Sequence, residues 1–318
     1  MLFWYVLGAV LLLALVVLTI AYICYRIAFY VSPKSHQAET AVIPMGDFME
    51  VLQKASKEQV EKVRDLPREE VSITSFDGLK LYGYYFEYAP GAPIEIMVHG
   101  YRGAALRDLS GGVLRCFRAG RSVLLVDQRC CGKSEGRTIT FGAKEHKDCL
   151  AWVDFVIKKF GPDVKIILTG ISMGAATVLM AGGRELPPNV IGILADCGYS
   201  SAEEIIKQTI KSMRLPIGLG YLFVRLGARI YGGFSPNDAS PKKRLKNCTV
   251  PVFLVHGEED SFVPCAMSRI NYEACAGKKK LVTIPGADHG MAYMTDPERY
   301  LAEMAAFFGP EASAPSRD

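Results

Sequence analysis

Apolar and polar positions divide the chain into three parts. Leu2 to Cys24 is apolar without one charged residue, which is long enough to cross a bilayer as a helix. Residues 33–69 are polar, and the alternating Glu and Lys of Lys54–Arg68 indicate a spacer with a short helix. From residue 70 onward, short apolar runs alternate with amphipathic stretches, the pattern of strands followed by helices.

The apolar runs predict a mostly parallel sheet. Period-two sequence over Val71–Tyr88 is broken at Asp77-Gly78, which is typical of a hairpin turn. Further strands are expected at Ile94–Val98, Ser122–Val126, Val164–Leu168, Val190–Ala195, Val250–His256 and Lys280–Ile284. Helices are expected near Asp108–Ala119, Gly142–Phe160, Ala175–Met180, Ala266–Ala276 and Pro297–Phe308. This alternation predicts an α/β fold with helices on both faces of the sheet.

The alternation stops between Ser200 and Asn247. Within this stretch, Ile205–Ile230 mixes apolar residues with five basic ones: Lys207, Lys211, Arg214, Arg225 and Arg229. One interpretation is an amphipathic lid whose apolar side faces the active site. The other is a segment that lies at an anionic membrane surface. Residues 310–318 are expected to be a disordered tail.

Composition narrows the class of protein. About 270 of the 318 residues follow the N-terminal segment, enough for one large domain. A net charge of +4, without a basic block interleaved with aromatics, argues against nucleic acid as a partner. The nine cysteines are odd in number and mostly lie in apolar stretches, which indicates free thiols and a reducing compartment. Since no C-x-x-C occurs, we expect no zinc site of that type, and the serine chemistry described below needs no metal and no cofactor.

The N-terminal segment, residues 1–32, is interpreted as a single-pass transmembrane anchor. Aromatic residues lie near both ends of its apolar run, as in interfacial belts: Trp4, Tyr5, Tyr22 and Tyr25. A cleaved signal peptide normally starts with basic residues, and this one does not. An uncleaved or unusual signal peptide is the alternative. Because Arg26 and Lys34 follow the run, the positive-inside rule places the following domain in the cytoplasm.

A G-x-S-x-G pentapeptide, Gly170-Ile171-Ser172-Met173-Gly174, joins an expected strand to an expected helix. In this context the serine sits on a strained turn, and its hydroxyl projects from the top of the sheet above a helix N-terminus. The pattern alone also occurs by chance in glycine-rich chains. Its position between strand and helix favours Ser172 as a nucleophile.

A serine nucleophile needs a histidine base and a carboxylate that orients the base. After Ser172 the chain offers Asp260 behind one expected strand and His289 behind the last one. Ser, Asp, His is the chain order of one known triad arrangement. Asp260 has three rivals that also lie at strand ends: Glu258, Glu259 and Asp196.

Two backbone N–H groups are expected to hold the oxyanion of the tetrahedral intermediate. One follows the nucleophile, at Met173. The other lies in His99-Gly100-Tyr101-Arg102-Gly103, where Tyr101 N–H is the candidate donor. The side chain of His99 is expected to brace this loop.

Five segments in order, HGYRG, DQRCCGKSEG, GISMG, HGEEDSFVP and PGADHG, resemble the α/β-hydrolase superfamily. Within it the chain resembles membrane-anchored bacterial hydrolases of the serine-aminopeptidase-like group and the Bem46-type hydrolases. The resemblance covers Val71 to Phe308. It implies an α/β-hydrolase domain over residues 70–309, with a short helical cap at about 200–247. It also implies Ser172, Asp260 and His289 as the triad and Tyr101 with Met173 as the oxyanion hole.

The expected function is that of a serine hydrolase acting on carboxylic esters or thioesters of acyl substrates. This fold also hosts peptidases, so an aminopeptidase is an alternative. A basic cap argues against it, because a substrate amino group needs acidic partners. A membrane-tethered binding module without activity is the third possibility.

Overall fold

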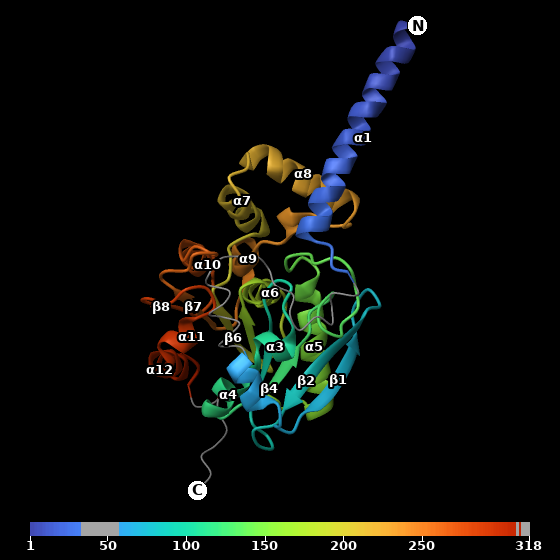
Figure 1. The fold of residues 1–318 in the computed structure, drawn as a ribbon. Helices are drawn as coiled ribbons and strands as arrows, with labels where there is room; N and C mark the ends of the chain where they lie inside the picture. The colour runs from blue at the N-terminus through green and yellow to red at the C-terminus, as the bar shows by residue number, and fades with distance from the viewer. Residues whose placement is uncertain (33–56, 310–311, 313–318) are drawn as a thin grey trace.

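The computed structural model describes residues 1–32, 57–309 and 312 (Figure 1). The first elements are α1 (Leu2–Ala28), β1 (Glu69–Thr74), β2 (Lys80–Phe86), β3 (Ile94–Val98), α3 (Ala105–Asp108), α4 (Ser110–Arg118), β4 (Ser122–Val126), α5 (Glu145–Phe160), β5 (Ile166–Ile171) and α6 (Met173–Gly182). They are followed by β6 (Val190–Asp196), α7 (Ala202–Ser212), α8 (Ile217–Ile230), α9 (Pro241–Arg244), β7 (Val252–Gly257), α10 (Ala266–Ala274), β8 (Lys279–Ile284), α11 (Ala292–Thr295) and α12 (Pro297–Phe308).

Within residues 57–309 the strands form one eight-stranded sheet in the order β1-β2-β4-β3-β5-β6-β7-β8. β1 and β2 form the predicted antiparallel hairpin, and β2 also runs antiparallel to β4. From β4 to β8 all neighbours are parallel. The carboxyl ends of these parallel strands therefore meet along one edge, where parallel sheets place their functional loops.

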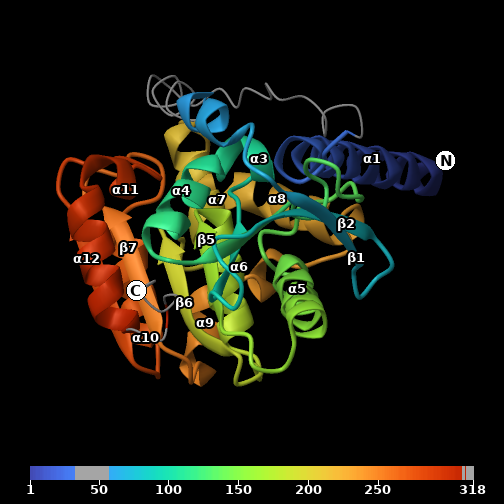
Figure 2. The same cartoon turned by 90° about the horizontal axis from the view of Figure 1, so that it is seen from below.

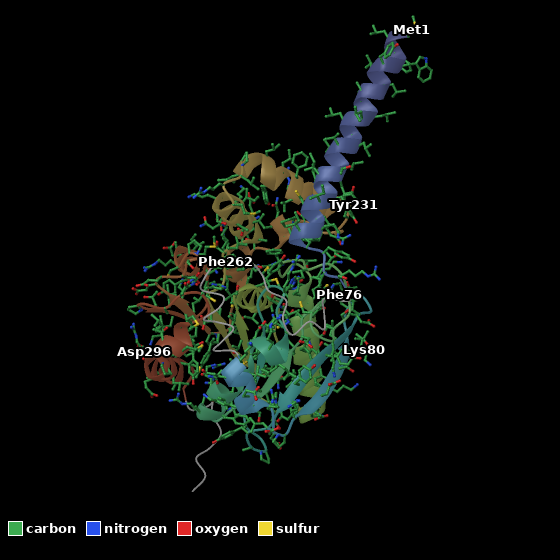
Figure 3. The ribbon with its side chains drawn as sticks, viewed as in Figure 1. Met1, Phe76, Lys80, Tyr231, Phe262 and Asp296 are labelled. Atoms are coloured by element: carbon green, nitrogen blue, oxygen red, sulfur yellow. The ribbon has the colours of Figure 1, made fainter. Side chains whose placement is uncertain are left out.

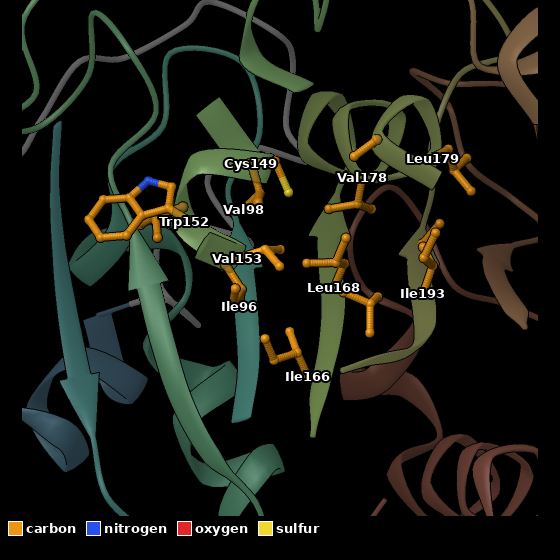
Figure 4. Packing of buried hydrophobic residues seen from close by; sticks show 14 of the residues in the cluster. Ile96, Val98, Cys149, Trp152, Val153, Ile166, Leu168, Val178, Leu179 and Ile193 are labelled. Atoms are coloured by element: carbon orange, nitrogen blue, oxygen red, sulfur yellow. The ribbon is translucent and has the colours of Figure 1, made fainter. Parts of the chain in front are cut away.

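The central strands are buried on both faces of the sheet, which explains their continuous apolar runs. On β3, Ile96 and Val98 pack toward α5 and α6, whereas Met97 packs toward α4. Figure 4 shows Trp152 of α5 and Leu179 of α6 packed with Ile96, Leu168 and other strand residues. α4 and α12 cover the opposite face, and Figure 2 shows the two helix layers on either side of the strands.

Two expected helices differ from their predicted bounds for local reasons. The helix expected at Asp108–Ala119 divides into α3 and α4 at Leu109, directly before Ser110-Gly111-Gly112, where two weak helix formers follow each other. The helix expected from Gly142 begins at Glu145 instead. The Glu145 carboxylate accepts hydrogen bonds from the N–H groups of Thr140 and Gly142 and thereby holds the preceding loop in a non-helical path.

The interrupted stretch forms a layer of helices above the carboxyl ends of the strands. α7 and α8 pack against each other, and α9 returns the chain toward β7. Apolar residues of this stretch divide between the interior and the surface. Ile206, Ile210, Tyr221 and Val224 are buried, whereas Met213, Leu219 and Leu222 are exposed.

α1 is long and apolar enough to cross a membrane. The end of α1, within the expected anchor of residues 1–32, packs on the rest of the chain. Ala21, Tyr25, Phe29 and Val31 are buried, and we call residues 21–31 the foot segment. The foot segment packs against α8, and its backbone pairs with residues 137–139 (Figure 1). The domain boundary at residue 32 stays a prediction.

The predictions for the linker and the tail fall largely outside the described residues. Of the linker, residues 57–63 are helical, and residues 33–56 lie outside the description. In the expected disordered tail, Ala312 is an exception because it is fully buried. Its carbonyl oxygen accepts a hydrogen bond from the buried guanidinium of Arg121, which needs such an acceptor.

Candidate active site

Ser172 lies at the bend between β5 and α6, with φ of 57° and ψ of −116°. A non-glycine residue in this region is strained, as expected for a serine held at a sharp turn. The flanking glycines make the turn possible. A Cβ on Gly170 would lie 2.2 Å from the Gly174 backbone, and one on Gly174 would lie 2.0 Å from the Val98 carbonyl oxygen.

The structure brings Ser172, His289 and Asp260 together from the ends of β5, β8 and β7. His289 Nδ1 lies 2.7 Å from Asp260 Oδ2, and its Nε2 lies 2.9 Å from Ser172 Oγ. Because a carboxylate only accepts, Nδ1 carries the proton, and Nε2 is left to accept from the serine hydroxyl. This is the geometry in which an imidazole can take the proton of a serine.

The Asp260 carboxyl is completely buried, yet it is held in its charged form. Burial raises its pKa, but hydrogen bonds from His256 and His289 and their charges outweigh this and lower the pKa to about 2. The backbone N–H groups of Phe262 and Val263 also donate to Oδ1, at 2.9 and 2.7 Å. Asp260 is therefore an ionised and rigidly held partner for His289.

The three rival carboxylates do not occupy this position. Glu258 accepts a hydrogen bond from the Thr283 hydroxyl on the surface, and Glu259 is exposed. Asp196 is buried at the end of β6, where Tyr300 donates to its Oδ2. Within the described part of the chain, Asp196 Oδ1 has no hydrogen-bond partner. Burial raises its pKa to about 6, which distinguishes it from Asp260.

His256 is a residue whose place sequence reasoning missed. Its Nε2 lies 3.0 Å from Asp260 Oδ2 and 2.8 Å from the Val263 carbonyl oxygen, and its Nδ1 lies 2.6 Å from Ser268 Oγ. It thus contacts the same carboxylate oxygen of Asp260 as His289 does. The only signal was its position at a strand end, four residues before Asp260.

The two candidate oxyanion donors flank the serine. Met173 is the first residue of α6, so its N–H has no acceptor within the helix. The loop after β3 lies alongside, since a Cβ on Gly100 would be 3.9 Å from Ser172 Oγ. His99 braces this loop as expected. Its Nδ1 donates to the Gly100 carbonyl oxygen at 2.7 Å, and its Nε2 accepts from the Gln128 N–H at 3.0 Å.

The oxyanion loop is also tied to the end of α1. The Tyr101 hydroxyl donates to the Ala28 carbonyl oxygen at 2.9 Å. The Arg102 guanidinium donates to the carbonyl oxygens of Ile27 and Tyr30 at 2.9 and 3.2 Å. The carbonyl groups of Ile27 and Ala28 belong to the last turn of α1, where a helix leaves them without partners of its own. The foot segment and the candidate oxyanion loop therefore hold each other in place.

Apolar side chains gather beside Ser172. Met173 belongs to a buried cluster with Tyr199 and Ile205, against which Tyr101 and Phe141 pack. Phe141 in turn contacts Phe29 of the foot segment edge to face. Phe262 lies edge to face with the His289 ring, 5.2 Å between centroids, and its position on the cap side is labelled in Figure 3. A surrounding of this kind suits an apolar substrate group.

Cys197 is the second residue that sequence reasoning missed. It has a positive φ of 47°, and its Sγ lies 4.0 Å from His289 Nε2. Among the described residues, Cys197, Asp260 and His289 form one group with the geometry to hold a metal. Asp260 and His289 are hydrogen-bonded to each other. Burial raises the pKa of the Cys197 thiol far above its usual value, so the thiolate that a metal would need is disfavoured. The donor set therefore suits a proton relay better than a metal ion.

Comparison with known proteins agrees with this architecture. Residues 96–303 match the family model described as "Alpha/beta hydrolase family". The uncharacterized protein YqkD of Bacillus subtilis (strain 168) is 26% identical over 246 residues, which cover 75% of this chain and 80% of YqkD.

Solved structures share the fold. The Pyrococcus furiosus esterase Pf2001 aligns with a TM-score of 0.64 at 24% identity and covers 77% of this chain and 92% of its own. Est1E from Butyrivibrio proteoclasticus, solved with ferulic acid bound, aligns with a TM-score of 0.56 at 23% identity, over 74% of this chain and 99% of its own. At these identities the likeness establishes the fold alone. The narrower Bem46-type resemblance stays a prediction.

Proposed function

This chain belongs to the α/β-hydrolase family, and we propose that it is a serine hydrolase that cleaves carboxylic esters or thioesters of acyl substrates. Ser172, His289 and Asp260 act as the triad, with the N–H groups of Tyr101 and Met173 as the oxyanion hole. The observation that carries the proposal is the unbroken hydrogen-bond chain from Ser172 Oγ through His289 to the buried Asp260.

The proposed reaction has two halves. Ser172 Oγ attacks the substrate carbonyl carbon while its proton passes to His289 Nε2, and the carbonyl oxygen takes up the negative charge. The intermediate collapses when His289 returns the proton to the leaving alcohol or thiol, which leaves an acyl group on Ser172. Water then attacks this ester with His289 as base, and the carboxylic acid departs. Asp260 stabilises the imidazolium formed in each half.

The aromatic and aliphatic residues beside Ser172 favour an acyl group over a small polar acid. The esterase described for Pyrococcus furiosus shares the fold and is consistent with ester cleavage.

An aminopeptidase is the alternative, and the cap disfavours it. Glu203 pairs with Lys207, and Glu204 pairs with Lys242. These glutamates are therefore already neutralised and are poor partners for a substrate amino group. A binding module without activity would not need the strained Ser172 backbone, because strain of this kind persists where a function uses it.

For location, we propose a single-pass membrane protein with the catalytic domain in the cytoplasm. A cleaved signal would remove the foot segment, and with it the acceptors of Tyr101 and Arg102. Retention of α1 therefore fits the packing. The orientation rests on Arg26 and Lys34 behind the apolar run.

The test uses the full chain in detergent with a fluorophosphonate probe and a panel of acyl esters of graded length, thioesters and aminoacyl amides. Ser172→Ala is expected to abolish labelling and to lower turnover by roughly 10⁶-fold. Ser212→Ala, at an exposed serine of the cap, is the matched control and should retain both. Wild-type turnover by Ser172→Ala would refute the assignment, and exclusive cleavage of aminoacyl amides would favour the peptidase.

A further inference from the structure

α8 carries apolar residues on two faces. Its inner face, with Tyr221, Val224 and Ala228, is buried against α7 and α1. Its outer face consists of Leu219, Leu222, the half-buried Leu226 and Ile230 at helical spacing, and Leu215 lies in the loop directly before the helix. Leu215, Leu219 and Ile230 are each more than half exposed. A set of exposed apolar residues of this kind marks a surface that a membrane or another protein covers.

The place of α8 relative to α1 is fixed by close packing. A Cβ on Gly227 would lie 2.3 Å from the Ala21 carbonyl oxygen, so the two backbones touch at this point. The Tyr231 hydroxyl donates to the Leu18 carbonyl oxygen at 3.1 Å, and the Tyr231 ring packs edge to face on Tyr22. Figure 1 shows α8 crossing the lower part of α1, and Figure 3 places Tyr231 beside it.

The length of α1 then decides how close α8 comes to the bilayer. Above the contact with α8, residues 2–17 form a helix only about 24 Å long at the usual rise per residue. The hydrocarbon core of a bilayer is about 30 Å thick. To cross it, α1 must be immersed to about Tyr22, the level at which it packs on Tyr231. The first charged residue of the chain, Arg26, comes only one turn later.

Basic residues lie on α8 and at the end of α7, near the outer face of α8. Lys211, Arg214 and Arg229 are exposed, and Arg225 is half-buried. In the part of the chain that the structure describes, none of these four forms an ion pair. Lys207, by contrast, pairs with Glu203 within α7. Cations beside an apolar stripe match the phosphates and acyl chains of an anionic lipid surface.

We propose that the outer face of α8 lies in the headgroup region of the bilayer that α1 crosses, with its leucines among acyl chains and its cations on lipid phosphates. This inference rests on the anchor in the proposed function. It gives the enzyme a second membrane contact that fixes the tilt of the domain.

The test uses the full chain in phosphatidylcholine–phosphatidylglycerol vesicles containing brominated phosphatidylcholine, which quenches tryptophan on contact. The chain has only two tryptophans, and Trp152 is buried in the domain core. Trp4 of the native chain reports whether α1 is inserted. Leu222→Trp, and independently Leu219→Trp, each combined with Trp4→Phe, report on α8. Tyr88→Trp with Trp4→Phe is the control, because Tyr88 is exposed behind β2, at the end of the sheet away from the cap.

Emission from tryptophan at 222 or 219 is expected to fall with the brominated fraction, as that of Trp4 does, while tryptophan at 88 is unaffected. If Trp4 is quenched and both α8 reporters behave like tryptophan at 88, the anchor stands and the proposed surface is refuted. If Trp4 is not quenched either, the anchor itself fails. Protection of the α8 reporters from soluble acrylamide without quenching by bromolipid would mean that a second copy covers this face, which also refutes the lipid contact.

The cations are tested in the Leu222→Trp background. Raising the phosphatidylglycerol fraction is expected to increase quenching. Replacing Lys211, Arg214, Arg225 and Arg229 by Gln should remove that increase and leave quenching in neutral vesicles. An increase that persists in the Gln variant would refute the phosphate contacts.

Discussion

At the scale of single residues, Asp196 and Asp260 end neighbouring strands, are both buried, and differ in charge state. Asp260 receives hydrogen bonds from two histidines and two backbone N–H groups, and its pKa falls to about 2. Asp196 receives one from Tyr300, and its pKa rises to about 6. The number of donors around each carboxyl, rather than its depth, decides which one stays ionised beside His289.

Asp260→Asn is expected to lower turnover by about 10⁴-fold, because an amide cannot hold the imidazole in the required tautomer or stabilise its charge. Glu258→Gln and Glu259→Gln should retain turnover within a few fold, since Glu258 pairs with the Thr283 hydroxyl on the surface and Glu259 is exposed. Ester hydrolysis by the three purified variants measures this. A severe loss in a glutamate variant with a mild one in Asp260→Asn would contradict the assignment.

Asp196 predicts a stability that depends on pH. Its folded pKa of about 6 exceeds that of an unfolded aspartate, so the folded state favours the protonated form. The resulting stabilisation is complete below about pH 4 and is lost as pH rises through 6. At pH 8, Asp196→Asn should therefore be more stable than wild type, with an unfolding free energy higher by at most ~3 kcal/mol and a correspondingly higher unfolding temperature. The difference should shrink toward pH 4, and a pH-independent difference would exclude this cause.

At the scale of elements, the contact between α1 and α8 depends on one glycine. Gly227→Ala places a methyl group against the Ala21 backbone and is expected to cost about 1–3 kcal/mol. Gly218→Ala, on the same helix, meets nothing within 4 Å and should stabilise the helix by about 0.5–1 kcal/mol. Thermal unfolding of the full chain in detergent compares the two. Equal shifts for both variants would show that the two helices do not touch.

Local patterns predicted most of the sheet because the central strands are buried on both faces and are apolar throughout, whereas β1 and β2 alternate between apolar and polar residues. The pentapeptide around Ser172 was also predictable, since its pattern lies in five consecutive residues between an apolar run and a helix. The bonds from Tyr101 and Arg102 to the foot segment were not predictable, because they join residues more than seventy positions apart. The sequence around a tyrosine or an arginine does not indicate which distant carbonyl group its side chain will bond. The hydrogen bond from Arg121 to the carbonyl of the buried Ala312 was unpredictable for the same reason, since it also joins residues far apart in the sequence.

At the scale of the whole molecule, the proposed anchor and the cap lie at the same end of the sheet. α1 and the cap lie on the side of the sheet where the parallel strands end, so the candidate active site faces the proposed membrane (Figure 1). An acyl substrate that partitions into lipid would thus be released on the side from which Ser172 is approached. The next question is on which side of the membrane the domain lies, which a fused reporter can measure.

The domain is expected on the cytoplasmic side, because Arg26 and Lys34 follow the apolar run. A reporter that folds only in an oxidising compartment, fused after Asp318, should be inactive, whereas a reporter that matures in the cytoplasm should be active. The opposite pair of results would reverse the orientation and leave the hydrolase proposal untouched.

The bonds between the foot segment and the oxyanion loop bear on how the protein is made. If α1 is the membrane anchor proposed above, its insertion places the carbonyl groups that accept from Tyr101 and Arg102 at the bilayer surface. On this proposal the domain folds onto a helix that is already inserted. A chain whose α1 misses the membrane would then leave the candidate oxyanion loop without its support.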